Sequence, residues 1–143
     1  MLVFTRLTQK MVLPVVLALA ILAAIAFPAE SKPIQVGNRF NSHSVRGRSG
    51  GAINSGDCGF ISQQPSQVVN VTQRMNYMQV RVRASGGKPT LLIRGANRRF
   101  CSIADDVSGV NPQISGVWVP GRYLIYVGDR TRTRHPFTLT ISK

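Results

Sequence analysis

Residues 77–84, with the sequence YMQVRVRA, decide the fold class because apolar and polar residues alternate along them without a break. Every second residue from Met78 to Ala84 is apolar, and Arg81 and Arg83 lie between them. A period of two residues is typical of a β-strand with one buried face. The segment therefore predicts a half-buried strand whose solvent side carries the two arginines.

Similar short runs follow one another through the rest of the chain, separated by turn residues such as Gly86-Gly87 and Pro120-Gly121. The runs cover residues 68–72, 90–94, 100–103, 113–119, 122–127 and 136–141. No useful length after the N-terminal segment has a helical period. Seven or so short strands predict an all-β protein with a single β-sandwich or jelly-roll domain.

The same alternation predicts which side chains form the core. These side chains are Val80, Val82, Leu92, Tyr123, Ile125, Phe137 and Leu139. In the last run, PFTLTI, the threonines would face solvent while the apolar residues between them face inward. The run RYLIYV at 122–127 leaves open which of its two sides faces the core.

Residues 1–26 have the order of a secretory signal peptide. Arg6 and Lys10 precede a 17-residue apolar run, and Ala24-Ile25-Ala26 fits the small-x-small cleavage pattern. We therefore expect an exported protein, periplasmic or extracellular. An uncleaved membrane anchor is the alternative, since the run reaches the lower limit for a spanning helix. Contact with a membrane is expected only through this leader.

Residues 27–59 are poor in large apolar side chains and rich in Gly, Ser, Asn and Arg. The segment RGRSGGAINSG has neither a helical nor a strand period. This composition predicts a flexible basic arm over 27–59 that leads into the β-sandwich at 60–143. Its Arg39, Arg46 and Arg48 could contact an anionic surface, although a solvated linker is the simpler interpretation.

Cys58 and Cys101 are the only cysteines in the chain. An even cysteine count in an exported protein predicts a disulfide. The chain-entropy estimate for closing a loop of this length is about 4 kcal/mol, before native strain is subtracted. Metal binding is the alternative, but zinc sites use closely spaced ligand pairs, and His43 and His135 provide no such spacing.

The charge balance is strongly basic, with 18 Lys and Arg against 5 Asp and Glu. Most of the excess is arginine, whose guanidinium fork matches phosphate, sulfate and carboxylate. We expect these arginines to bind an acidic polysaccharide, an envelope surface or an acidic protein. The candidate anion-binding residues are Arg81, Arg83, Arg94, Arg98, Arg99, Arg130, Arg132 and Arg134. A basic, merely solvated exterior is the alternative, and the few aromatic residues argue against nucleic acid.

Residues 91–142 resemble the bacterial pre-peptidase C-terminal domain and its jelly-roll relatives. The matching elements are the turn at 95–97, the pair Asp105-Asp106, the turn PGRY at 120–123 and the final strand at 137–141. The resemblance implies a secreted, non-catalytic β-sandwich, and some relatives bind calcium or carbohydrate polymers. That family is often attached to hydrolases, whereas no hydrolase is recognisable in this chain. The resemblance does not explain the basic charge.

Calcium is the one cofactor that the chain suggests, and its candidate ligands are Asp105, Asp106 and Asn111. Ordinary turn chemistry of Asp and Asn is the simpler interpretation of these residues. Neither histidine has an evident nucleophile and orienting acid, so we expect no enzyme.

The sequence therefore predicts a non-catalytic exported binding or structural module that associates with an anionic surface or polymer through its arginines. An accessory subunit that docks on an acidic protein partner is the first alternative. A small hydrolase or inhibitor with an unrecognised site is the weaker one. Salt dependence would separate the arginine-driven functions from the last, because ions screen exposed charges.

Overall fold

The alternating segment lies in strand β6 (Met75–Ala84), which pairs antiparallel with β11 (Pro136–Ser142). The computed structural model describes residues 31–104 and 111–143. In the β6–β11 register, Val82 lies opposite Leu139 and Arg81 lies opposite Thr140. Both strands therefore send their apolar residues to one side of the sheet and their polar residues to the other.

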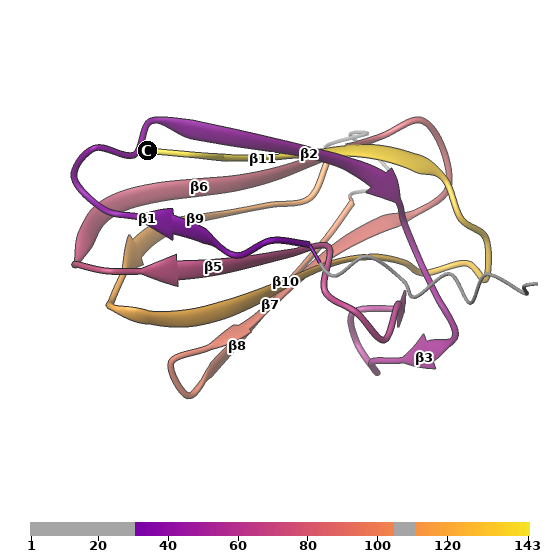
Figure 1. The fold of residues 1–143 in the computed structure, drawn as a ribbon. Helices are drawn as coiled ribbons and strands as arrows, with labels where there is room; N and C mark the ends of the chain where they lie inside the picture. The colour runs from indigo at the N-terminus through magenta and orange to yellow at the C-terminus, as the bar shows by residue number, and fades with distance from the viewer. Residues whose placement is uncertain (1–30, 105–110) are drawn as a thin grey trace, which may run out of the picture.

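Strands β2 (Ser42–Arg48) and β9 (Gln113–Trp118) complete a four-stranded sheet in the order β2-β11-β6-β9. A second, seven-stranded sheet faces it (Figure 1). The strands of the second sheet are β1 (Ile34–Val36), β3 (Ile53–Asn54), β4 (Phe60–Ile61), β5 (Gln67–Val71), β7 (Pro89–Gly95), β8 (Arg98–Ile103) and β10 (Gly121–Asp129). The described residues thus form an all-β sandwich, as the sequence predicted.

Strand β10 joins the parts of the second sheet. It pairs antiparallel with β5 and β4 along one edge and with β7 along the other, and β7 in turn pairs with β8. The short β1 lies parallel to β5. All four strand pairs that involve β7 or β10 are antiparallel. Antiparallel strands can be joined by short turns, which agrees with the short turns between the runs in the sequence.

The main core lies between the two sheets and contains six of the seven predicted core residues. The seventh, Leu92, is also buried, but it belongs to a second apolar cluster with Cys58, Ile61 and Tyr126. This second cluster explains why the sequence of 122–127 does not show which of its two sides faces the core. Alternate residues of β10 pack into the main core, while Tyr126 and the partly buried Leu124 pack into the second cluster.

The expected flexible arm over 27–59 is wrong for its described part, residues 31–59. Strand β2 lies in that segment and pairs with β11 along its whole length, from Ser42↔Ser142 to Arg48↔Pro136. The backbone N–H and C=O groups on this edge of β11 need hydrogen-bond partners. Strand β2 provides these partners, although it has little apolar surface of its own. The sandwich therefore begins well before residue 60.

The predicted signal segment at 1–26 lies outside the described residues, as do residues 27–30. Within the described part, no helix has the length and apolar character needed to cross a bilayer. Cleavage or retention of the leader therefore stays a prediction of the sequence.

We expect Leu139→Ala to lower the free energy of unfolding by about 2–5 kcal/mol, because Leu139 is fully buried between the sheets. Thr138→Ala is the matched control on the same strand, since Thr138 faces the opposite side and should change stability by only about 0.5 kcal/mol. Urea denaturation of both variants measures the difference. Equal losses would contradict the assigned parity of β11.

Candidate functional site

The outer face of the four-stranded sheet is polar because the residues that alternate with the core residues are polar. Strands β6 and β11 form a shallow groove of about 350 Å³ on this face. Its lining residues are Gln79, Arg81, Arg83, Thr138, Thr140 and Ser142. The strand register places an arginine of β6 beside a threonine of β11 at two successive positions. The groove therefore offers hydroxyl groups and guanidinium groups side by side.

Strand β2 extends this face on the other side of β11. Arg46 lies opposite Thr138, which in turn lies opposite Arg83, so one threonine stands between two arginines. Two strand spacings separate the backbones of Arg46 and Arg83 by roughly 10 Å. Ser44 occupies the next row, where its hydroxyl is 3.3 Å from that of Thr140. We call the outward residues of β2, β11 and β6 the arginine face.

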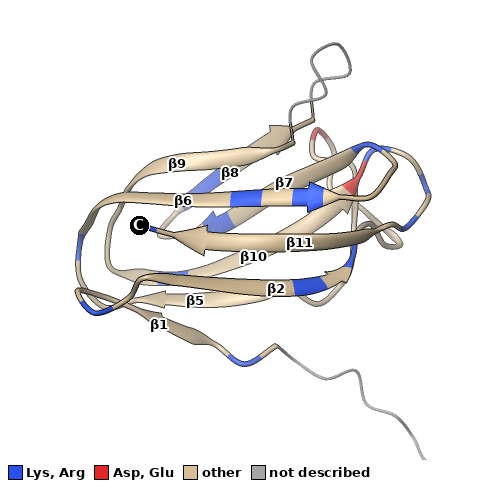
Figure 2. Ribbon diagram, turned by 90° about the horizontal axis from the view of Figure 1, so that it is seen from above, with Lys and Arg blue, Asp and Glu red and all other residues tan. Residues whose placement is uncertain are grey.

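The arginine face contains no acidic residue among those that the structure describes. The described acids are Asp57 and Asp129, and neither belongs to this sheet (Figure 2). Asp129 is buried at the end of β10, where its Oδ1 accepts hydrogen bonds from the backbone N–H and the hydroxyl of Thr131. On the arginine face itself, the guanidinium of Arg81 donates to the neutral side-chain oxygen of Gln79. The positive charge there is not neutralised locally.

The eight predicted arginines lie in three places rather than in one patch. Arg81 and Arg83 line the groove, whereas residues 130–134 form the turn between β10 and β11. This turn lies against the end of β2, because Arg48 donates to the backbone oxygen of Arg134 at 3.0 Å. The remaining three, Arg94, Arg98 and Arg99, belong to β7 and β8 in the other sheet.

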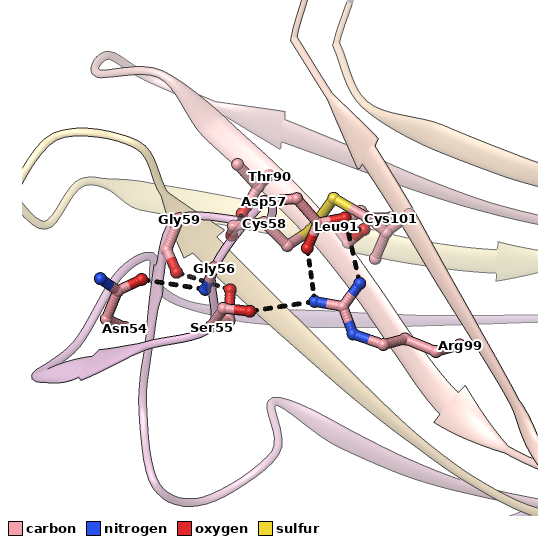
Figure 3. A network of polar contacts seen from close by, with 10 residues as sticks. All are labelled: Asn54, Ser55, Gly56, Asp57, Cys58, Gly59, Thr90, Leu91, Arg99 and Cys101. Atoms are coloured by element: carbon pink, nitrogen blue, oxygen red, sulfur yellow. Dashed lines mark hydrogen bonds and ion pairs between the residues drawn. A yellow bond between two sulfur atoms is a disulfide. The ribbon is translucent and has the colours of Figure 1, made fainter.

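Arg99 is engaged inside the protein. Its guanidinium contacts both carboxylate oxygens of Asp57, at 2.6 and 3.1 Å, and donates to the backbone oxygen of Ser55 (Figure 3). The predicted disulfide is confirmed next to it, with 5.7 Å between the Cα atoms of Cys58 and Cys101. The ion pair and the disulfide together tie the loop between β3 and β4 to strand β8.

Two other predicted arginines lie over aromatic rings. The guanidinium of Arg94 is 5.6 Å from the ring centre of Tyr126, and that of Arg132 is 5.0 Å from the ring centre of Phe60. Cation–π contacts of this kind contribute modestly at exposed sites. Both arginines are exposed, so they add to the basic surface, but neither lines the groove.

Two of the three candidate calcium ligands, Asp105 and Asp106, lie outside the described residues. Asn111 is described and lies just before β9. The described part of the chain has no group of three or more His, Cys, Asp or Glu residues that could hold a metal ion. Calcium binding by the 105–111 loop therefore stays a prediction.

The sequence places Arg46 and Arg48 in a flexible arm, where they could contact an anionic surface but where a solvated linker is the simpler interpretation. The structure makes them part of a strand and of the arginine face. A signal was present, since SHSVRGR alternates Ser and Arg with the less polar His43, Val45 and Gly47. The pattern was weak because only one of these inward residues is a large aliphatic.

Comparison with solved structures defines the class of fold. The pre-peptidase C-terminal domain of a collagenase from Bacillus anthracis matches 81% of this chain and 98% of that domain, with a TM-score of 0.55 and 17% identity. PliG of Aeromonas hydrophila is a periplasmic inhibitor of g-type lysozyme. Its structure aligns with this chain at a TM-score of 0.44 and 16% identity, over 78% of this chain and 94% of the PliG chain. The protein is a β-sandwich like the pre-peptidase C-terminal domain, as the sequence resemblance implied.

No family model matches the chain. An uncharacterized protein of Synechococcus elongatus is 44% identical to it over 102 residues, which are 68% of this chain and 73% of the relative. The chain belongs to the same family as this Synechococcus protein.

We expect the pKa of the Asp57 carboxyl to lie below its usual range, because the hydrogen bonds from Arg99 favour the ionised form. A lowered folded-state pKa gives a contribution to stability that is present above the ordinary carboxyl pKa and is lost as the pH falls through the lowered value. NMR titration of the carboxyl carbon measures it. Arg99→Gln should return the pKa toward its ordinary value, whereas the neighbouring Arg98→Gln should not, and equal effects would contradict the pairing.

Proposed function

We propose that this protein is a non-catalytic exported binding module that holds an acidic polysaccharide on the arginine face. The observation that carries the proposal is the alignment of Arg46, Thr138 and Arg83 across three neighbouring strands, with Arg81 and Thr140 in the next row. Carboxylate or sulfate groups would contact the guanidinium groups, and sugar hydroxyls would contact the threonine and serine hydroxyls between them.

Binding to such a face depends on the sum of several weak contacts. Each arginine is exposed or only partly buried, so a single ion pair with it would contribute little in water. A polymer that repeats its charges can contact several arginines at once, and the field of an unneutralised basic surface attracts it from a distance. We therefore expect affinity that falls steeply with ionic strength.

The composition of the groove favours a polysaccharide over an acidic protein. Protein interfaces usually have an apolar or aromatic centre, surrounded by polar residues. The groove instead is lined by arginine, threonine, serine and glutamine alone. Hydroxyl and amide groups in the middle of a shallow basic groove are better suited to bind a hydrated, hydroxyl-rich ligand than to bind the surface of another protein. The predicted leader at 1–26 would bring the protein to compartments where such polymers occur.

We expect Arg81→Gln/Arg83→Gln to weaken binding to an acidic polysaccharide roughly tenfold at low salt, because two charge-assisted contacts are lost. The matched control is Arg94→Gln/Arg122→Gln, which removes the same charge from exposed positions of the other sheet. The measurement is retention on immobilised alginate, a polyuronate, across a salt series. Neutral dextran serves as the uncharged matrix.

Two results would contradict this function. If both double variants lose retention equally, net charge decides binding and the arginine face has no special role. If immobilised polyglutamate retains the wild type more strongly than alginate, and Arg81→Gln/Arg83→Gln abolishes that retention, the partner is an acidic protein. Circular dichroism of each variant establishes that the fold is intact.

A further inference from the structure

A second pocket, of about 220 Å³, lies away from the arginine face. It opens near the turn between β7 and β8, where the start of β8 approaches the end of β9. These are the outermost strands of the two sheets on that side of the sandwich. The lining residues are Arg74, Arg98, Phe100, Val117, Trp118, Val119 and Tyr123. We call it the edge pocket.

The inner wall of the edge pocket is aromatic and rigid. Trp118 and Tyr123 are almost completely buried, and their ring centres lie 4.6 Å apart. The Tyr123 hydroxyl donates to the backbone oxygen of Val119 at 2.8 Å, which fixes the ring. Burial raises the pKa of Tyr123, so its phenol stays neutral and adds no negative charge to the pocket.

The outer wall exposes apolar surface that a folded protein usually covers. Phe100 is 40% exposed and Val117 is 50% exposed, and they are two of the five large apolar side chains exposed in the described part of the chain. Contiguous apolar surface beside a cavity is typical of a ligand site. The Trp118–Tyr123 pair and the side chains of Phe100 and Val117 therefore line the same small pocket.

Two cations complete the edge pocket. Arg74 precedes β6 and Arg98 begins β8, and both side chains are exposed. Within residues 31–104 and 111–143, neither guanidinium makes a hydrogen bond or an ion pair, in contrast to the neighbouring Arg99, which is paired with Asp57. Neither of the two described acids pairs with Arg74 or Arg98, so no acid in the described part of the chain neutralises these two charges.

We infer that the edge pocket is a binding site for a small organic anion that carries an apolar ring next to its carboxylate. The ring would pack between Phe100 and the Trp118–Tyr123 pair, and the carboxylate would face Arg98 and Arg74. The volume is sufficient, because an apolar cavity of about 150 Å³ holds benzene. An anion without apolar surface would leave the exposed side chains of Phe100 and Val117 in water, and a neutral apolar molecule would leave both arginines without an anionic partner. This site is independent of the arginine face.

Trp118 provides a direct measurement, because it is the only tryptophan in the chain and it lines the pocket. The probe is cyclohexanecarboxylate, which does not absorb where tryptophan does. Titration into the purified protein should change the Trp118 fluorescence saturably. Cyclohexylmethanol, which has the ring without the charge, and acetate, which has the charge without the ring, should each bind about tenfold more weakly or worse.

Variants separate the two parts of the site. Arg74→Gln/Arg98→Gln should weaken cyclohexanecarboxylate at least tenfold and leave cyclohexylmethanol unchanged. Phe100→Ser, at a half-exposed position, should weaken both ring compounds and spare the fold. Arg81→Gln/Arg83→Gln is the matched charge control, and it should bind cyclohexanecarboxylate like the wild type.

Three results would overturn the inference. The first is the absence of any saturable change, either in Trp118 fluorescence or in the backbone amide shifts of residues 98–100 and 117–119. The second is equal affinity for cyclohexanecarboxylate and cyclohexylmethanol, which would show that the arginines do not contribute. The third is an equal loss in Arg81→Gln/Arg83→Gln, which would show that net charge alone attracts the anion. Loss confined to Arg74→Gln/Arg98→Gln and Phe100→Ser supports the site.

Discussion

The register between β6 and β11 is the constraint on which the rest of the structure depends. Val80 and Val82 face the core opposite Ile141 and Leu139, so the residues between them must face solvent. A shift of one residue would turn Arg81 toward the apolar core, and burial of an unpaired guanidinium is far too costly to occur. The same alternation therefore builds the core and the arginine face, and neither can change register without destroying the other.

The sequence predicted the strands whose two sides differ strongly in polarity. β6 and β11 alternate large aliphatic residues with Arg or Thr, which leaves one possible orientation. β2 was missed because its inward residues are His43, Val45 and Gly47. Gly47 is small for a structural reason, since a Cβ there would lie 2.9 Å from the Phe137 ring. A strand that covers a large neighbour with a small residue carries almost no hydrophobic signal of its own, and its pairing depends on β11.

The position of a candidate site residue could be predicted only where a charged residue lies in a segment with a clear strand period. Arg81 and Arg83 were placed correctly on a solvent face, because spacing along one strand determines that face. Arg98 and Arg99 could not be distinguished in the sequence, although they occupy opposite sides of β8. Arg99 meets Asp57 because the disulfide holds the β3–β4 loop against that side, whereas Arg98 lines the edge pocket. Which arginine is paired thus depends on contacts between distant segments, which no local pattern contains.

The net positive charge of the arginine face depends on the scarcity of acidic residues as much as on the number of arginines. Of the two described acids, Asp57 is paired with Arg99, and Asp129 is buried at the end of β10. Arg46, Arg48, Arg81 and Arg83 consequently repel one another across neighbouring strands, at a small cost that water and salt reduce. The fold tolerates this cost because the apolar sides of β6 and β11 are buried between the sheets. A bound polyanion would remove the repulsion, so its binding and the stability of the sheet are thermodynamically linked.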